Sequence, residues 1–355
     1  MGRFEKLFEL LPDSVESVLI TSDVNRRYFT GMKSSAGVVL AFRDKAHLLI
    51  DFRYIEKARE TVTSAEVIES KDLYKEISSL LRQKGVRNMA IESMDMTVSR
   101  LNVFKKHLKF VGILETDTLS NAINKLRIVK DDDEIKCIMK AQEIAEAAFD
   151  EILNFIKEGV TEREIALELD RLMLEKGAEA ISFDTIALAG ENTSMPHGVP
   201  SDKKVKNGEF VLMDFGAVYN GYHSDMTRTV CVGEPDEEMI KVYSVVLAAQ
   251  EKAIAAAKAG ITGTELDSIA RKVICDAGYG ECFGHSLGHG VGLEIHELPN
   301  ATPRYDKMLE KGAVITIEPG IYIAGKFGVR IEDFVILTEN GCINMTKSAK
   351  NIISL

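Results

Sequence analysis

Residues 207–216 read NGEFVLMDFG, and residues 311–320 read KGAVITIEPG, a segment of similar design 104 positions further along the chain. Each segment has a Gly-containing turn, an apolar run typical of a β-strand, and an acidic residue followed two positions later by Gly. The acidic residues are Asp214 and Glu318. Any two turn–strand elements share Gly and apolar residues, so part of the likeness is expected without a repeat. The equivalent placement of the two acidic residues is not explained in that way. We therefore interpret the two segments as equivalent parts of a repeat.

A second match precedes the first one in both copies. Residues 157–165 read KEGVTEREI and residues 258–266 read KAGITGTEL, and the offset of 101 continues to Gly177 and Gly278. Each copy is typical of a Gly C-cap, a Thr N-cap with Glu three positions later, and a helix that ends at the second Gly. Two matches in the same order indicate a duplicated α/β unit. A pseudo-two-fold axis would bring the two acidic residues together, which predicts a metal site built by symmetry.

The length of 355 residues exceeds that of most single domains. A boundary is expected near residues 118–131, which gives an α/β domain over residues 1–122 and an α+β domain containing the repeat over residues 123–355. Asp131 opens a capping box at the start of the second domain, and the apolar spacing that follows predicts a helix to about residue 158.

The first domain alternates short apolar runs with segments of helical spacing. It contains no chemical motif, and Asp51, Arg53 and Tyr54 are interpreted as a local polar network. Strands are predicted over residues 18–20, 37–42, 47–50 and 89–91, and helices over residues 72–84 and 97–108.

Charge and composition argue against several classes of protein. The net charge is −11, and the chain after residue 120 carries 25 basic against 38 acidic residues. So acidic a segment is a poor nucleic-acid binder, and no apolar run is long enough to span a membrane, so we expect neither partner. The five cysteines form no CxxC pair and the N-terminus lacks a signal-peptide pattern, so we expect free thiols and a cytoplasmic location.

Four carboxylates carry the predicted chemistry. Asp214 and Asp225 lie on successive apolar stretches joined by a Gly-containing turn, which predicts a β-hairpin whose aspartates face one cavity. Glu318 and Glu332 are related similarly in the second half. Four carboxylates in an apolar setting repel one another unless cations neutralise them. An oxygen-rich shell completed by one imidazole suits Mn²⁺, Co²⁺ or Fe²⁺ better than a metal that prefers thiolates.

The imidazole comes from residues 283–297, which read FGHSLGHGVGLEIHE. His285 and His289 are four residues apart, as in the helical HExxH zinc motif, but the glycines of this stretch oppose a helix and no Glu follows His285. We therefore reject that zinc motif. His296 lies in the same stretch, and His197 lies in a loop marked by Pro and Gly, from which it could reach over a substrate.

Together these residues resemble a known family. The ordered motifs PHG, DFG, SDMTRT, GHSLGHGVGLEIHE, IEPG and RIED are similar to those of the metallopeptidases that comprise Xaa-Pro aminopeptidases, prolidases and methionine aminopeptidases. The resemblance covers about residues 125–355 and implies the creatinase or pita-bread fold. Residues 1–122 resemble the creatinase-type N-terminal α/β domain, with YFTG and DFRY as weaker markers.

The resemblance implies two divalent metal ions, with Mn expected and Co, Fe or Zn left open. Asp214 and Asp225 would hold one metal, His289 and Glu318 would belong to the other, and Asp225 and Glu332 would bridge the two. The resemblance also assigns four residues to the substrate side or to support of the metals, namely His197, His285, His296 and Arg330.

The implied activity is hydrolysis of the bond between an N-terminal residue and a following proline, by a homodimeric Xaa-Pro aminopeptidase acting on peptides. Arg330 and the additional N-terminal domain favour this branch over the methionine aminopeptidases. His296 would stabilise the oxyanion, His197 would hold the substrate, and Glu318 would shuttle a proton to the leaving nitrogen. Two alternatives stay open: a dipeptide-restricted prolidase, and a non-catalytic binding protein on the same fold.

Overall fold

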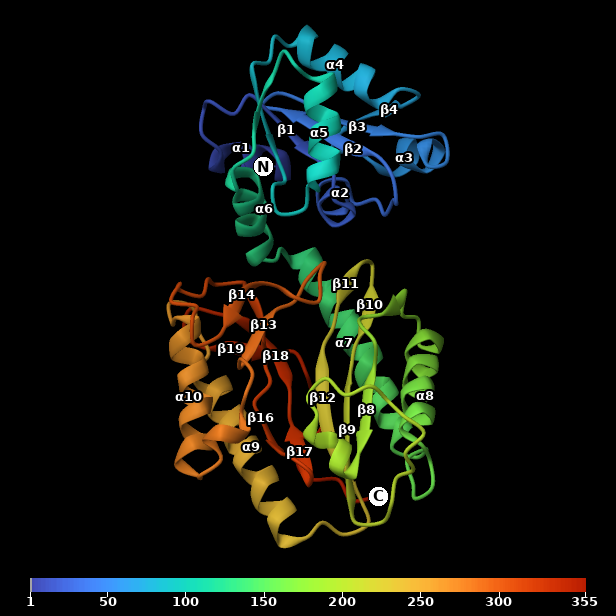
Figure 1. Cartoon of the computed structure of the whole chain (residues 1–355), viewed down its shortest axis with the longest axis vertical. Coiled ribbons are helices and arrows are strands. Elements are labelled where there is room, and N and C mark those ends of the chain that lie inside the picture. Colours follow the sequence, from blue (N-terminus) through green and yellow to red (C-terminus); the bar gives the residue numbers. More distant parts are fainter. Residues whose placement is uncertain (1) are drawn as a thin grey trace. The chain divides into compact units, whose positions relative to one another are not determined.

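The computed structural model describes residues 2–355. The chain forms two compact units, the first ending at Arg127 and the second beginning at Ile128 (Figure 1). The boundary expected after residue 122 lies inside helix α6 (Thr118–Ile128). No helix in the described part of the chain is both long and apolar enough to cross a membrane.

The first unit is built on a six-stranded mixed sheet in the order β4-β3-β2-β1-β5-β6. Its strands are β1 (Ser17–Ile20), β2 (Val38–Phe42), β3 (Ala46–Ile50), β4 (Glu66–Glu69), β5 (Asn88–Ile91) and β6 (Gly112–Leu114). The four strands predicted from apolar runs are the four central ones. The two edge strands were not predicted, because they are short and only partly buried and therefore lack a long apolar run.

The helices of this unit include both predicted ones. Its helices are α1 (Arg3–Leu10), α2 (Asp23–Thr30), α3 (Ile55–Thr61), α4 (Leu73–Gln83), α5 (Val98–His107) and α6. The local polar network is also confirmed, since the Arg53 guanidinium binds the Asp51 carboxylate at 2.7 Å and the Tyr54 hydroxyl lies 2.7 Å from Ser35 Oγ.

The first half of the second unit packs two helices against antiparallel strands. Its elements are α7 (Asp132–Ile152), α8 (Glu162–Glu175), β7 (Ala180–Ile181), β8 (Ile186–Ala189), η1 (Gly190–Ser194), β9 (Glu209–Phe215), β10 (Ala217–Tyr219), β11 (Tyr222–His223) and β12 (Met226–Val232). The strands form the sheets β12-β9-β8 and β11-β10-β7.

The second half repeats this plan of two helices followed by antiparallel strands. Its elements are α9 (Glu237–Ala256), α10 (Gly263–Asp276), η2 (Gly280–Cys282), β13 (Gly288–Gly290), β14 (Glu297–Ala301), β15 (Val314–Ile317), β16 (Gly320–Ile323), β17 (Phe327–Arg330), β18 (Asp333–Leu337) and β19 (Cys342–Asn344). The strands form the sheets β14-β13-β15-β18-β19 and β16-β17.

Details of the two halves support the duplication. Thr161 caps α8, and its backbone N–H donates to Glu164 at 2.8 Å; Thr262 caps α10, and its backbone N–H donates to Glu265 at the same distance. Each cap residue also forms an isolated antiparallel bridge, to Lys204 in the first half and to the matching Met308 in the second. Each half therefore starts its second helix with the same local structure.

Two helix ends differ from the prediction. Helix α7 ends at Ile152 instead of near residue 158, because the amide of Asn154 donates to the Glu151 carbonyl and the chain continues in turns. Ile156 is still buried in these turns. The apolar spacing therefore predicted correctly that this residue is buried, but the prediction that it lies in a helix was wrong. The first Gly of each copy of the repeat is not a C-cap but adopts a positive φ in a turn beyond the helix.

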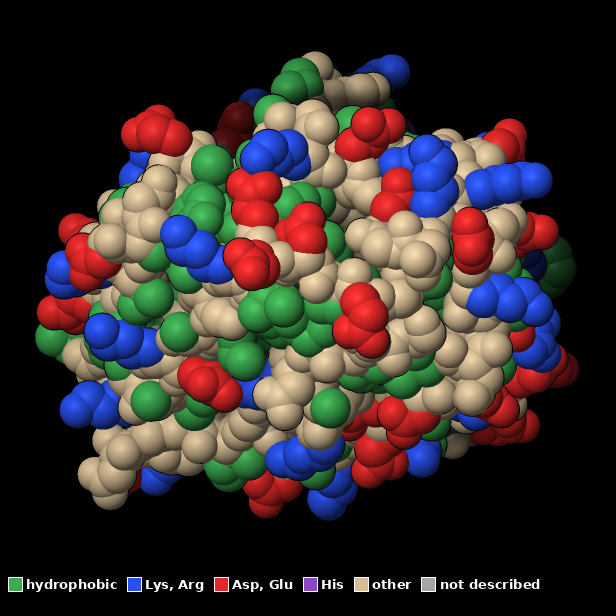
Figure 2. Space-filling model, turned by 90° about the horizontal axis from the view of Figure 1, so that it is seen from below, with side chains coloured by type: hydrophobic (Ala, Val, Ile, Leu, Met, Phe, Trp, Pro, Cys, Tyr) green, Lys and Arg blue, Asp and Glu red, His purple; other side chains and the backbone are tan. Residues whose placement is uncertain are grey.

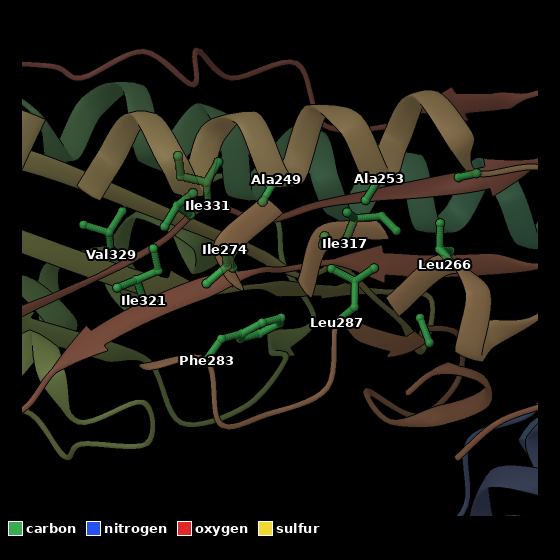
Figure 3. Close-up of a cluster of buried hydrophobic side chains, with 14 of the residues drawn as sticks. Ala249, Ala253, Leu266, Ile274, Phe283, Leu287, Ile317, Ile321, Val329 and Ile331 are labelled. Carbon is green, nitrogen blue, oxygen red and sulfur yellow. The ribbon is translucent and has the colours of Figure 1, made fainter. Parts of the chain in front are cut away.

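Two apolar clusters form the core of the second unit, and each is centred on one of the halves. In the second half, Ala249 and Ala253 project from α9 toward Ile317 at the end of β15, and Leu266 projects from α10 into the same cluster (Figure 3). In the first half, Phe149 of α7 packs against β9 in a separate cluster. The strands are therefore held from one side by helices, which leaves their other side available for polar groups.

One face of the molecule carries charged side chains of both signs (Figure 2). On the face shown in Figure 2, acidic and basic side chains are interspersed, with hydrophobic side chains between them. That face presents no extended field of one sign.

Candidate metal centre

The first two carboxylates come from one hairpin. Asp214 lies on β9 opposite Thr227 of β12, and Asp225 directly precedes β12. Between them the chain turns at Asn220 and Gly221, whose φ angles of 47° and 81° are those of the tight turn that joins twisted strands. The predicted hairpin is confirmed, and it places both aspartates at the same end of the β9–β12 pair.

The other two carboxylates come from the second half. Glu318 directly follows β15, and Glu332 lies between β17 and β18. The backbone N–H of Glu332 donates to the Thr227 carbonyl at 3.1 Å, and the Thr227 hydroxyl donates to the Glu332 carboxylate at 2.7 Å. The two halves are thus joined at the point where their carboxylates converge.

His289 lies on β13 and completes the cluster. Its Nε2 atom is 3.6 Å from Asp225 Oδ2 and 3.4 Å from Glu318 Oε1. Its Nδ1 atom lies 3.1 Å from the Gly290 carbonyl, so the proton sits on Nδ1 and the Nε2 lone pair faces the carboxylates. Asp225, His289 and Glu332 each offer a ligand atom within 4.8 Å of the others, a spacing that suits one metal ion.

The charges of this cluster are strongly perturbed. Burial raises the pKa of Asp225 and Glu332 well above their usual range, and the neighbouring carboxylates raise it further. Burial also raises the pKa of Glu318 to about 8, despite the opposing effect of Arg330. The pKa of His289 falls to about 4, because burial disfavours the charged imidazolium. The metal-free cluster therefore binds protons that a cation would displace.

Arg330 is the permanently charged cation among the residues around this cavity. Its guanidinium is buried and lies 2.5 Å from Asp214 Oδ2. It also donates to the Thr227 hydroxyl at 3.0 Å and to the Tyr322 hydroxyl at 2.9 Å. Arg330 thereby fixes one oxygen of Asp214, while the buried Oδ1 oxygen has no hydrogen-bond partner within the described chain. A buried carboxylate oxygen without a donor is a natural metal ligand.

All nine residues predicted for the site surround one cavity of about 470 Å³. Its other lining residues are Phe183, Asp184, Ile186, Pro196, Ser286, Gly288, Ile295, Asn300 and Thr302. His296 packs edge to face on His289, with 4.3 Å between ring centroids. His285 Nε2 lies 2.8 Å from the Tyr322 hydroxyl, which leaves its Nδ1 proton for the Ser286 carbonyl.

Sequence reasoning missed the residues that hold these groups in place. Thr227 binds both Glu332 and Arg330, Tyr322 links Arg330 to His285, and the Thr316 hydroxyl accepts from the His289 backbone N–H at 3.0 Å. Thr227 and Thr316 lie within the strands of the quoted motifs, so their position was a usable signal. Nothing in the sequence singled out Tyr322.

The residues present fit a divalent cation. The cluster offers carboxylate oxygens and one neutral imidazole nitrogen in a buried setting, where burial and then the neighbouring carboxylates raise the pKa of Asp225 and Glu332. Oxygen-rich shells of this kind suit Mn²⁺ and similar ions.

Comparison with protein families gives two matches that together cover most of the chain. Residues 136–339 match the model of "Metallopeptidase family M24". Residues 3–129 match the model of the "Creatinase/Prolidase N-terminal domain". The fold class expected from the sequence is thereby confirmed.

Individual relatives extend over the whole chain. A protein named Xaa-Pro dipeptidase from Pyrococcus furiosus is 42% identical over 353 residues, covering 99% of each chain. The solved structure of an Xaa-Pro dipeptidase from Bacillus anthracis is 41% identical, covers 99% of both chains and has a TM-score of 0.96. That of an X-Pro aminopeptidase from Thermotoga maritima is 38% identical, covers 99% of this chain and 100% of that one, and has a TM-score of 0.93.

Proposed function

The chain belongs to metallopeptidase family M24, and from this premise we propose that it is a prolidase, which hydrolyses the peptide bond of Xaa-Pro dipeptides. The observation that carries the proposal is the convergence of Asp214, Asp225, His289, Glu318 and Glu332 on one cavity. Relatives named Xaa-Pro dipeptidase that match end to end support this substrate class. A cavity of about 470 Å³ is of the size that encloses a small ligand.

The ligands divide between two divalent cations as the resemblance suggested. Asp214 and Asp225 would hold one ion, His289 and Glu318 would hold the other, and Asp225 and Glu332 would bind both. Mn²⁺ is the expected ion, because the set is rich in oxygen and has one imidazole. Such ions lower the pKa of a bound water and polarise a carbonyl group.

The surrounding residues bind and orient the substrate. His296 donates to the oxygen of the scissile carbonyl as negative charge develops there, and His197 holds the substrate from its loop. Glu318 carries a proton to the nitrogen of the leaving proline, which has no N–H of its own. Arg330 keeps Asp214 in place. Burial and the Arg330 charge lower the pKa of His285 to about 4, and the Tyr322 hydroxyl lies 2.8 Å from its Nε2 atom.

A second candidate is the Xaa-Pro aminopeptidase, which cleaves the same bond in longer peptides. The likeness to the Thermotoga maritima structure favours it. Rates on Xaa-Pro and on Xaa-Pro-Yaa peptides of the same first residue separate the two candidates. A prolidase acts on the dipeptide and poorly on the tripeptide, whereas comparable or faster cleavage of the tripeptide overturns the dipeptidase proposal.

Metal removal tests the chemistry that both candidates share. Dialysis against EDTA should abolish cleavage of Ala-Pro, and Mn²⁺ or Co²⁺ should restore it, while metal analysis of the purified protein counts the ions. Full activity after complete metal removal would refute the proposal.

Two further expectations belong to it. A homodimer is expected and is tested by analytical ultracentrifugation. A cytoplasmic location is also expected, because all five cysteines are free thiols and thiols stay reduced in that compartment.

A further inference from the structure

The loop of residues 291–296 joins β13 to β14 and brings Ile295 and His296 to the cavity. His289 lies on β13 at the start of this loop, and the His296 ring at its end packs on the His289 ring. The positions of these two imidazoles therefore depend on how the loop is closed. Small loop movements would displace His296 relative to the carboxylates.

A buried ion pair closes the loop at its end. Glu297 is the first residue of β14 and directly follows His296. Its Oε1 oxygen lies 2.7 Å from Lys130 Nζ, and the side chains are 1% exposed for Lys130 and 6% exposed for Glu297. Lys130 precedes Asp131, the N-cap of α7, and its backbone N–H donates to the Gly312 carbonyl. The pair thus ties the loop to the fixed start of a long helix.

The Glu297 carboxylate is also packed against the loop itself. A Cβ atom on Gly292 would lie 2.4 Å from Glu297 Oε1, so a side chain at this position would displace the carboxylate. The Gly292 carbonyl accepts from the His223 backbone N–H at 2.8 Å, which ties the middle of the loop to β11. The loop is therefore held at its middle by β11 and at its end by Lys130.

Energetics indicate that this pair serves geometry more than stability. Removing two charges from water costs several kcal/mol per ion, and a buried pair gains little net stability over apolar residues of similar volume. Its geometry is nevertheless narrowly defined, because any displacement of the carboxylate leaves a buried charge unpaired. We infer that Lys130 is a positioning residue that acts through Glu297 to hold His296 in register with His289. The inference rests on the proposed peptidase activity, because it assigns Lys130 to the reaction through His296.

The test uses the full-length protein with Lys130 changed to Met and to Arg. Lys130→Met keeps the length of the apolar stem and removes the charge, and Lys130→Arg keeps the charge. Lys176→Met is the matched control, because Lys176 pairs with Glu151 between α7 and α8 of the same unit and does not line the cavity. Thermal unfolding shows whether each variant is folded at the assay temperature.

The kinetic readout is the separation of kcat from KM on Xaa-Pro. For Lys130→Met, kcat should fall roughly 10- to 100-fold, as is typical when a catalytic group is displaced by about 1 Å, with a much smaller change in KM. Lys130→Arg should recover most of the loss, and Lys176→Met should match the parent. A folded Lys130→Met variant with parental kcat overturns the inference, and so does a loss that Lys130→Arg fails to rescue.

A second readout does not depend on activity. The ring signals of histidine in the metal-free protein are recorded by ¹H–¹³C NMR, and the His296 signal is assigned with His296→Asn. In Lys130→Met the His296 signal should shift or broaden, while that of His47, which belongs to the first unit, stays in place. An unchanged His296 signal contradicts the inference, whether or not the parent protein cleaves Xaa-Pro. Absence of Xaa-Pro cleavage by the parent protein refutes only the proposed function.

Discussion

Replacing Arg330 with Met should destabilise the metal-free protein, and loading the variant with metal should restore most of the lost stability. The Arg330 side chain is 3% exposed, and its guanidinium binds Asp214, Thr227 and Tyr322. Without it, the carboxylates at the junction of the two halves lose the cation that partly balances them. Bound metal ions supply that positive charge by another route, so their presence should compensate for the substitution.

The size of the effect follows from the burial of the pair. Removing one partner of a buried ion pair typically costs about 3–5 kcal/mol, because the other charge stays buried without compensation. Metal at a hundred times its dissociation constant adds about 2.7 kcal/mol per site to the folded state. Two sites could therefore offset most of the loss.

Urea denaturation at pH 7.5, with EDTA or with Mn²⁺, measures both quantities. Arg171→Met in α8 is the matched control, because Arg171 also binds two carboxylates, Glu168 and Glu175, but is exposed, so its loss should leave the midpoint almost unchanged. If Arg330→Met is as stable as Arg171→Met in EDTA, the electrostatic account of this site is wrong.

Three further predictions follow from the same geometry. Asp225→Asn and Glu332→Gln should each lower the metal content and abolish Xaa-Pro cleavage even with excess Mn²⁺, as elemental analysis and assay will show; normal activity would exclude both as ligands. In the metal-free protein, the Glu318 pKa of about 8 exceeds its unfolded value, so this group stabilises the fold below about pH 4.5 and the contribution is lost as the pH rises toward 8. Urea denaturation at pH 6 and pH 8 should show that loss in EDTA, and a rise in stability would contradict it. Gly216→Ala should cost roughly 1–3 kcal/mol, because a Cβ there would lie 2.0 Å from a backbone oxygen, whereas Gly341→Ala meets no atom and should cost much less. Equal midpoints for these two variants would refute the packing argument.

The parts of the fold that depend on neighbouring residues in the chain were predictable from the sequence. Capping boxes at Asp131, Thr161 and Thr262 follow from residue type and spacing, and each is present in the structure. The central strands of the first unit follow from apolar runs. The end of α7 could not be predicted in this way. Apolar spacing indicates which residues are buried, but it does not indicate that the Asn154 amide bonds to the Glu151 carbonyl where the helix ends.

The site was predictable as a set of residue types and not as a network. Two matched motifs and a histidine-rich stretch pointed to the side chains that now line one cavity. Their supports, Tyr322 and Lys130, come from other segments and carry no local signature. These two residues contact the site only because the fold brings distant segments of the chain together. No short pattern in a single sequence indicates which distant segments will meet.

The proposed ligands are divided between the two halves of the second unit, which would tie metal binding to completion of that unit. Asp214 and Asp225 belong to the first half, whereas the second half supplies His289 and two glutamates, and the halves meet through Thr227 and Glu332. A nascent chain that has completed only the first half presents two aspartates, a common surface feature with little affinity for an ion. Under the proposed function, the full ligand set would exist only after the two halves have docked, so metal binding would require the completed second unit.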